Sequence, residues 1–171
     1  MDGIQAMNVR PERPQDHRAI ADVTVQAFAG EERSAGTEPA IVAALRASGA
    51  LALSLVATDE EEVIGHAAFS PVTIDGDDRG WFGLGPVSVR PDRQRSGVGS
   101  ALIRRGLRLL DEGGAAGCVV LGEPAYYRRF GFVNDPALRY HGAPAEYFMR
   151  LAFRGEAPAG RVEYHPGFGA R

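Results

Sequence analysis

The residues best suited to binding a ligand lie in segment 94–100, where Gly97 and Gly99 stand at the start of a predicted helix. The first turn of a helix presents backbone N–H groups without helical acceptors, and the helix dipole places partial positive charge behind them. Glycine removes side chains that would hold a ligand away, and Arg93 and Arg95 add positive charge. The pattern predicts a site for a phosphate or pyrophosphate.

Two common phosphate-binding motifs do not fit this segment. A Walker A loop needs Lys followed by Ser or Thr after its last glycine, whereas Ser100 and Ala101 follow Gly99. A dinucleotide-binding fingerprint needs a third glycine three residues after Gly99, where Leu102 stands. The sequence therefore excludes both motifs.

The elements that must position this loop alternate between strands and helices. The hydrophobic pattern predicts strands at residues 7–10, 51–58, 63–74, 82–89, 119–121 and 162–164, and helices at 17–28, 38–48, 98–112 and 125–130. This order predicts a mixed α/β sheet. Without a repeat or a long linker, the chain is expected to be one domain over residues 1–171.

Two features of the pattern make finer predictions. Gly85-Pro86 interrupts strand 82–89, and because proline cannot donate to a sheet ladder, we expect a bulge or a parting of strands there. In helix 17–28 the spacing places Ile20, Val23, Val25 and Phe28 on one face. Helix 98–112 should expose its arginines and bury Val98, Leu102, Ile103, Gly106, Leu109 and Leu110.

Composition bounds the class of protein. With 171 residues, 44% hydrophobic and 24% charged, the chain resembles an ordinary globular domain. A net charge of −3 argues against a nucleic-acid partner, and no apolar stretch is long enough to cross a membrane. The start of the chain lacks the pattern of a secretion signal, and Cys118 is the single cysteine, so a cytoplasmic location is expected. The four histidines lack metal-ligand spacing, so no metal is expected.

Two segments resemble landmarks of the GNAT acetyltransferases. Residues 94–99, Gln-Arg-Ser-Gly-Val-Gly, match the Q/R-x-x-G-x-G/A pyrophosphate loop of that family. Residues 126–132, Tyr-Tyr-Arg-Arg-Phe-Gly-Phe, resemble its second landmark, and segment 121–132 is most similar to the YhbS-like group of predicted acetyltransferases. The resemblance implies the GNAT acyl-CoA N-acyltransferase fold, in which a mixed, mostly antiparallel sheet splays between its fourth and fifth strands and carries helices on both faces.

The resemblance also implies roles for individual residues. Acetyl-CoA would be the co-substrate, and the main chain of Val87, Ser88 and Val89 would pair with its pantetheine arm. Gln94 would shape the turn. Backbone N–H groups would bind the pyrophosphate from Arg95, Ser96, Gly97, Val98, Gly99 and Ser100. The mechanism usual in the family is direct attack of a neutral amine on the thioester, with a main-chain N–H polarising the carbonyl.

The resemblance indicates a residue for the general acid but none for the general base. Tyr127 aligns with the tyrosine that protonates the leaving thiolate, and a phenol with pKa of about 10 is protonated at neutral pH. Tyr126 would take that place if the helix began one residue differently, and either ring could instead be ordinary core packing. Several residues have the right chemistry for a general base, and a water chain is an alternative: Glu32, Glu38, Glu123, His66 and His141.

The acceptor stays open between a polyamine, an amino acid, an antibiotic, a peptide N-terminus and a protein lysine. The resemblance assigns substrate choice to segments 31–48 and 134–164 and makes a homodimer a frequent arrangement among relatives. A non-catalytic acyl-CoA-binding sensor, or transfer of a longer acyl group, are the alternative functions. For three other features we expect structural roles: packing for Trp81, an inert buried thiol for Cys118, and a solvated turn for the acidic run 59–62.

Overall fold

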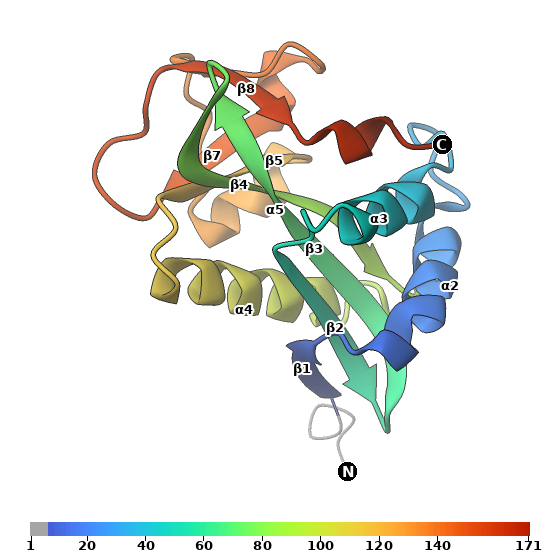
Figure 1. The fold of residues 1–171 in the computed structure, drawn as a ribbon. Coiled ribbons are helices and arrows are strands. Elements are labelled where there is room, and N and C mark those ends of the chain that lie inside the picture. The colour runs from blue at the N-terminus through green and yellow to red at the C-terminus, as the bar shows by residue number, and fades with distance from the viewer. Residues whose placement is uncertain (1–6) are drawn as a thin grey trace.

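The computed structural model describes residues 7–171 and shows one central sheet with helices packed on it (Figure 1). The helices are α2 (His17–Phe28), α3 (Glu38–Ala47), α4 (Val98–Glu112) and the short α5 (Pro124–Tyr127). Short 3-10 turns include η2 (Pro91–Arg93), η3 (Arg128–Phe130) and η5 (Pro166–Gly169). The strands are β1 (Met7–Pro11), β2 (Leu53–Asp59), β3 (Glu62–Ile74), β4 (Asp77–Val89), β5 (Gly117–Leu121), β6 (Leu138–Arg139), β7 (Phe148–Ala152) and β8 (Gly160–Tyr164).

The sheet is mixed, as the sequence predicts. The main strand order is β1-β2-β3-β4-β5-β7, and its neighbours are antiparallel except β4 and β5, which run parallel. β8 pairs antiparallel with the end of β3, at Val72–Ile74, and so brings the C-terminal segment to the middle of the molecule. None of the helices among residues 7–171 combines the length and apolar character needed to span a bilayer.

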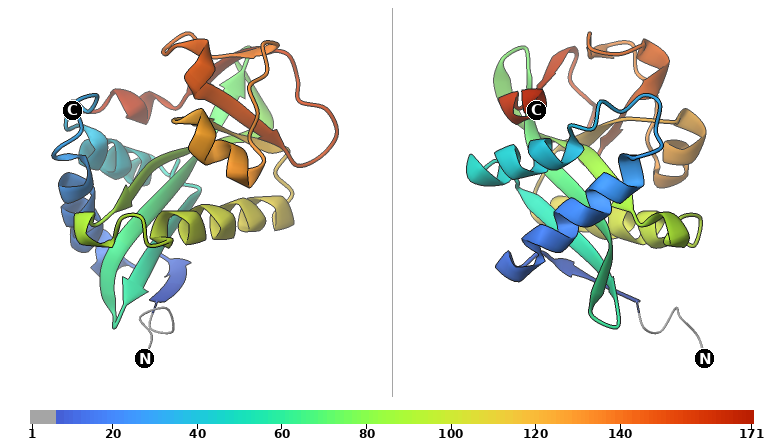
Figure 2. Two further views of the ribbon diagram at one scale, coloured as in Figure 1. Left: turned by 180° about the vertical axis from the view of Figure 1, so that it is seen from behind. Right: turned by 90° about the vertical axis from the view of Figure 1, so that its right-hand side faces the viewer.

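Helices cover both faces of the sheet (Figures 1 and 2). α4 lies over β2 and β3 on one face, where Gly106 passes so close to Phe69 that a Cβ would come 2.3 Å from the ring. α2 and α3 lie on the opposite face, with Ile20, Val23 and Val42 packed on Val56. The amphipathic pattern of each helix therefore determines which side of the sheet it covers.

Two details of the predicted helix faces are wrong. In α4 Leu110 is buried as predicted, but Leu107 is buried in addition and Leu109 is only partly buried, because the sheet lies slightly to one side of the stripe expected from the sequence. In α2 Val25 is 56% exposed, since only the side with Ile20 and Val23 meets the sheet. Neither change alters the fold.

Strands β4 and β5 part where the sequence places Gly85-Pro86. β5 pairs with β4 from Trp81 to Leu84 and no further, and the register between β3 and β4 shifts across the same region. Gly85 has φ 139°, a backbone conformation that residues other than glycine rarely adopt. The predicted splay is confirmed, and it opens the sheet beside the N-terminus of α4.

Candidate active site at the splayed strands

The loop before α4 presents unpaired backbone amides to solvent. Gly97 is the N-cap with φ 92°, and no side chain caps the helix. The first backbone hydrogen bond of α4 runs from the Ala101 N–H to the Gly97 carbonyl at 3.0 Å, so the amides before Ala101 in the first turn have no helical acceptor. A Cβ on Gly97 would meet nothing within 4 Å, which shows that the space before the helix is open. The turn is built to receive an anion.

Side chains hold this loop in shape from both ends. The Gln94 side-chain amide donates to the Val89 carbonyl at 3.1 Å, which ties the loop back to β4. The Ser96 hydroxyl donates to the Arg93 carbonyl. Arg95 adopts φ 64° and is exposed, so the loop keeps one guanidinium directed away from the core.

The acidic run 59–62 is not simply a solvated turn, which corrects the sequence-based interpretation. Asp59 pairs with Arg93, and Glu62 pairs with Arg90 at 2.7 Å. The two residues between them, Glu60 and Glu61, make the turn itself with φ 49° and 69°. The ends of the run therefore anchor the segment that leads from β4 into the loop, and Arg93 has less free charge than the sequence suggests.

Replacing Asp59 with asparagine should weaken acetyl-CoA binding by about 3- to 10-fold, because a partly buried ion pair that holds a loop contributes about 1 kcal/mol to its ordering. Isothermal titration calorimetry measures the effect. Glu60→Gln removes a charge from the same turn without removing an ion pair and serves as the control. Equal dissociation constants for Asp59→Asn and Glu60→Gln would contradict the anchoring role.

Beyond the bulge, one edge of β4 has no strand partner among residues 7–171. On the other edge Val87, Ser88 and Val89 pair with Ala67, His66 and Gly65 of β3. The side chain of Ser88 is 1% exposed, so at this residue the strand can offer a ligand only its main chain. An unpaired strand edge is a template for another extended chain.

The tyrosines of α5 lie between this edge and the end of β5. The Tyr126 hydroxyl lies 3.4 Å from the Ser100 hydroxyl, in the first turn of α4, and Arg129 stacks over the Tyr126 ring at 4.6 Å. Tyr127 turns inward, with its ring 5.9 Å from that of Phe132. The surroundings of the two candidates thus differ: Tyr126 contacts the first turn of α4, and Tyr127 packs against Phe132.

The surroundings of Tyr127 keep its phenol protonated. Burial, together with nearby Tyr126 and Cys118, raises the pKa of Tyr127 to about 12. A group with this pKa stays neutral across the working range of an enzyme, so its proton is present when a leaving thiolate forms. Cys118 itself is fully buried and its pKa is raised by desolvation, so the thiol is no nucleophile.

A cavity of about 250 Å³ adjoins the bulge on the face of α2 and α3. Gly85 and Pro86 form one side of it, and elements from the start, middle and end of the chain complete it. The complete lining is Phe28, Glu38, Ile41, Leu84, Gly85, Pro86, Leu121, Tyr140, Tyr164 and Phe168. The cavity and the anion-binding turn therefore approach the opening between β4 and β5 from different sides.

Of the candidate bases, Glu38 alone lines this cavity. Glu32 is exposed in the loop before α3, and His141 lines two other cavities near the C-terminal segment. Glu123 stands at the N-cap of α5, where its main-chain carbonyl accepts the Tyr126 and Tyr127 amides at 3.1 Å each, while its side chain is exposed. Glu123 therefore positions Tyr127 through its backbone.

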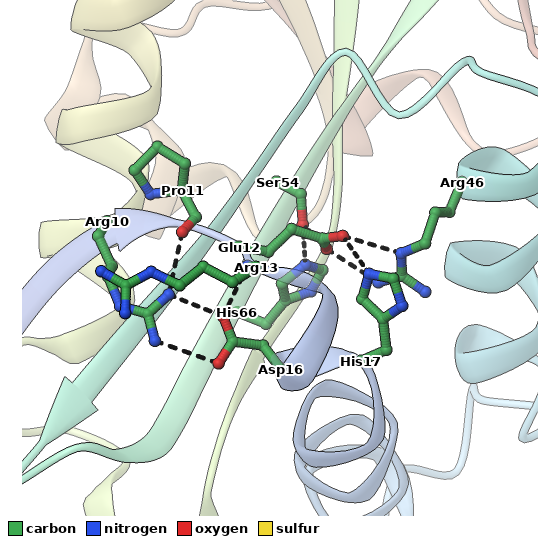
Figure 3. A network of polar contacts seen from close by, with 9 residues as sticks. All are labelled: Arg10, Pro11, Glu12, Arg13, Asp16, His17, Arg46, Ser54 and His66. Carbon is green, nitrogen blue, oxygen red and sulfur yellow. Dashed lines mark hydrogen bonds and ion pairs between the residues drawn. The ribbon is translucent and has the colours of Figure 1, made fainter.

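His66 lies in a buried polar network on the α2 face of the sheet (Figure 3). Its Nε2 is 2.7 Å from the Ser54 hydroxyl, which also contacts the Glu12 carboxylate. Glu12 in turn binds Arg46 at 2.8 Å and His17 at 3.0 Å. The network joins β2, β3, α2 and α3, so His66 holds elements together rather than facing the opening of the sheet.

Burial lowers the pKa of His66 to about 4, although the charge of Glu12 acts in the opposite direction. The unfolded chain takes up a proton at His66 below pH 6.5, whereas the folded chain does so only near pH 4. The contribution of neutral His66 to the free energy of unfolding is therefore fully present above pH 6.5 and is lost as the pH falls toward 4. The Glu12 carboxyl does not interfere in this window, because hydrogen bonds from Arg46 and Ser54 outweigh its burial and leave its pKa below the usual 4.5.

Chemical denaturation should show this loss. Between pH 7.5 and pH 5 the free energy of unfolding should fall by about 2 kcal/mol through His66. His66→Gln should be less stable at pH 7.5 but should lose that part of the pH dependence, whereas His141→Gln, on the surface, should keep it. The same slope in wild type and His66→Gln would contradict the assignment.

The sequence analysis missed Tyr164 as a site residue. Its ring lies over Gly83 and in the cavity wall, and its hydroxyl is buried without a hydrogen-bond partner among residues 7–171. The signals in the sequence were its place at the end of an expected strand and within segment 134–164, to which the resemblance assigns substrate choice, but nothing local reveals that this strand pairs with β3. The packing interpretation of Trp81 is correct, since it is 2% exposed within a hydrophobic cluster.

Comparison with known proteins agrees with this geometry. A family model described as an acetyltransferase (GNAT) domain matches residues 8–133. The uncharacterized N-acetyltransferase YhbS of Escherichia coli K12 is 38% identical over 169 residues, covering 95% of this chain and 98% of the relative.

Two solved structures have nearly the same fold along their whole length. A GNAT family acetyltransferase from Brucella melitensis, solved in complex with acetyl-CoA, is 51% identical with a TM-score of 0.87, covering 95% of this chain and 97% of the other. YhbS from Escherichia coli, in complex with CoA, is 35% identical with a TM-score of 0.88, covering 96% and 92%.

Proposed function

This chain belongs to the GNAT acetyltransferase family, and we propose that it transfers the acetyl group of acetyl-CoA to a primary amine by direct attack on the thioester. The Brucella relative in complex with acetyl-CoA supports this donor. The pantetheine arm pairs with the open edge of β4 at Val87, Ser88 and Val89. The pyrophosphate lies on the amides of the first turn of α4.

The main support for the proposal is that the open edge of β4 and the free amides of α4 form one continuous surface. The unpaired edge of β4 leads from the bulge at Gly85-Pro86 to the free amides after Gly97, and Tyr127 follows Tyr126, whose hydroxyl lies 3.4 Å from that of Ser100 in the same turn. A ligand with an extended polar arm and an anionic end fits this surface. Its reactive end would then lie at the bulge, next to the cavity that contains Glu38.

Acetyl transfer at the bulge can be written with every bond and proton accounted for. An ammonium group first loses a proton, and the neutral nitrogen then forms a bond to the thioester carbonyl carbon. The C–S bond breaks, the nitrogen releases its second proton to a base or to water, and the leaving thiolate takes the phenolic proton of Tyr127. The proton released by nitrogen restores the phenol, so the products are an N-acetyl amide and CoA with a free thiol.

Two measurements test the proposal in sequence. Calorimetric titration of the purified protein with acetyl-CoA should show binding, and a thiol reagent should then detect release of CoA when amines are added, with the acetylated amine identified by mass spectrometry. Absence of binding by folded protein would overturn the assignment of the donor. Binding without CoA release across a broad panel of amines would overturn transfer and favour an acyl-CoA sensor.

A further inference from the structure

The cavity beside Gly85-Pro86 has a mostly apolar and aromatic wall. α2 contributes Phe28, and the C-terminal segment contributes Tyr140, Tyr164 and Phe168. The Tyr140 and Tyr164 rings make a T-shaped contact and the Tyr164 and Phe168 rings a tilted one, each with centroids 5.0 Å apart. Apolar walls favour an apolar ligand body, and aromatic faces also attract cations.

One carboxylate interrupts this wall. Glu38, the first residue of α3, is the single charged residue in the lining. The Ser34 hydroxyl donates to its Oε1 at 2.7 Å, and Oε2 has no protein partner within residues 7–171. Neither arginine nor lysine lines the cavity. The site thus offers a fixed negative charge and no counter-charge for a ligand carboxylate.

Tyr164 contributes its ring to the wall, whereas its hydroxyl lies behind the wall. The hydroxyl is buried and has no hydrogen-bond partner in the part of the chain that the structure describes. Tyr164 therefore adds aromatic surface to the cavity. Burial, with nearby Cys118, Tyr140 and Tyr127, raises the pKa of Tyr164 well above 10, so the group is a neutral phenol that can donate or accept.

We infer that the acetyl acceptor is a primary amine on a short, uncharged, apolar or aromatic body, held with its nitrogen at the Glu38 carboxylate and its body against the aromatic wall. This inference rests on the proposed function and specifies its substrate class. The rings and aliphatic side chains surround the body of the amine. Glu38 attracts the ammonium group and takes the proton that must leave before attack.

The same features disfavour other acceptors. An α-carboxylate, as in a free amino acid, would lie near Glu38 in an apolar cavity without a cation to balance it. A second ammonium, as in a polyamine, would be buried without a second acid. The volume of about 250 Å³ lies below the ~300–1,000 Å³ of sites that enclose drug-sized ligands, so the cavity fits a small head group.

Matched pairs of amines test the substrate class. 2-Phenylethylamine and phenylalanine differ by a carboxylate, and pentylamine and cadaverine differ by a second ammonium. With saturating acetyl-CoA, kcat/KM should be at least ~10-fold higher for the first member of each pair, since a desolvated unpaired charge costs more than one factor of ten. A preference for phenylalanine or cadaverine would overturn the inference while leaving acetyl transfer intact.

A variant tests Glu38. Glu38→Gln should lower kcat/KM for 2-phenylethylamine at least ~10-fold and weaken its calorimetric binding to the CoA-loaded protein, with the dissociation constant for acetyl-CoA within twofold of wild type. Glu32→Gln is the matched control, because it removes an exposed charge in the loop before α3 that does not line the cavity.

These experiments distinguish failure of the inferred substrate class from failure of the proposed acetyl transfer. Unchanged amine binding and turnover in Glu38→Gln would overturn the inference, whereas CoA release with any amine would keep the proposed function. Failure of every amine to release CoA from bound acetyl-CoA would instead overturn the proposed function and, with it, the inference.

Discussion

Gly97→Asp should weaken acetyl-CoA binding at least ~100-fold, which corresponds to about 2.7 kcal/mol. The substitution places a carboxylate at the N-cap of α4, beside the amides proposed to bind the pyrophosphate. Aspartate caps helices well and tolerates the left-handed conformation that Gly97 adopts at φ 92°. The open space around the position accepts the side chain, so the protein should stay folded while the carboxylate occupies the site and repels the ligand.

Gly97→Asn is the control for this prediction, because asparagine has the same shape, a similar preference for the N-cap and no charge. It should weaken binding by less than ~10-fold, and the difference between the two variants is then electrostatic. Calorimetry measures both, and raising the salt concentration should narrow the gap between them. Similar affinities in Gly97→Asp and Gly97→Asn would place the pyrophosphate elsewhere.

The sequence predicts best those features whose causes lie close together in the chain. Helix α4 begins and ends at the predicted residues, because its apolar stripe and the Gly113-Gly114 stop are local. The splay at Gly85-Pro86 is also predicted, since proline and the conformation of Gly85 act on their own strand. The anion-binding loop belongs to this group, for its amides are unpaired by virtue of standing first in a helix.

Features that depend on contacts between distant segments were not predicted. Asp59 and Arg93 meet only because β2 and β4 both flank β3, so the acidic run looks solvated until the sheet is known. Tyr164 reaches the cavity because β8 pairs with the end of β3, where Val72 is its partner. The choice of Glu38 among several acids has the same origin, since it depends on which helix lies beside the bulge.

The two sides of the proposed site depend on the sequence to different degrees. The proposed donor side consists of backbone: the edge of β4 and the first amides of α4, with glycines that allow close approach. The proposed acceptor side consists of side chains from α2, α3 and the C-terminal segment, together with the bulge. A donor surface made of main chain tolerates much sequence change, whereas an acceptor cavity made of side chains changes with each substitution. Acceptor choice can therefore diverge among proteins that keep one donor.

Tyr127→Phe should lower kcat by about 10²–10³-fold, within the range that general acid catalysis contributes, and leave the dissociation constant for acetyl-CoA within about threefold. Phenylalanine keeps the ring packed against Phe132 and removes only the hydroxyl. In wild type, the raised pKa of about 12 keeps the phenol protonated, so the rate should rise with pH as the amine loses its proton and should not fall again below pH 10.

Tyr126→Phe separates the two tyrosines. Its hydroxyl contacts Ser100 at 3.4 Å, so its loss should weaken acetyl-CoA binding by a few-fold and leave kcat nearly unchanged, since a single neutral hydrogen bond contributes about 1 kcal/mol. Pre-steady-state mixing of acetyl-CoA-loaded protein with amine measures the transfer step directly. Equal loss of binding and transfer in Tyr127→Phe would assign Tyr127 to packing, and a large loss of kcat in Tyr126→Phe alone would make Tyr126 the acid.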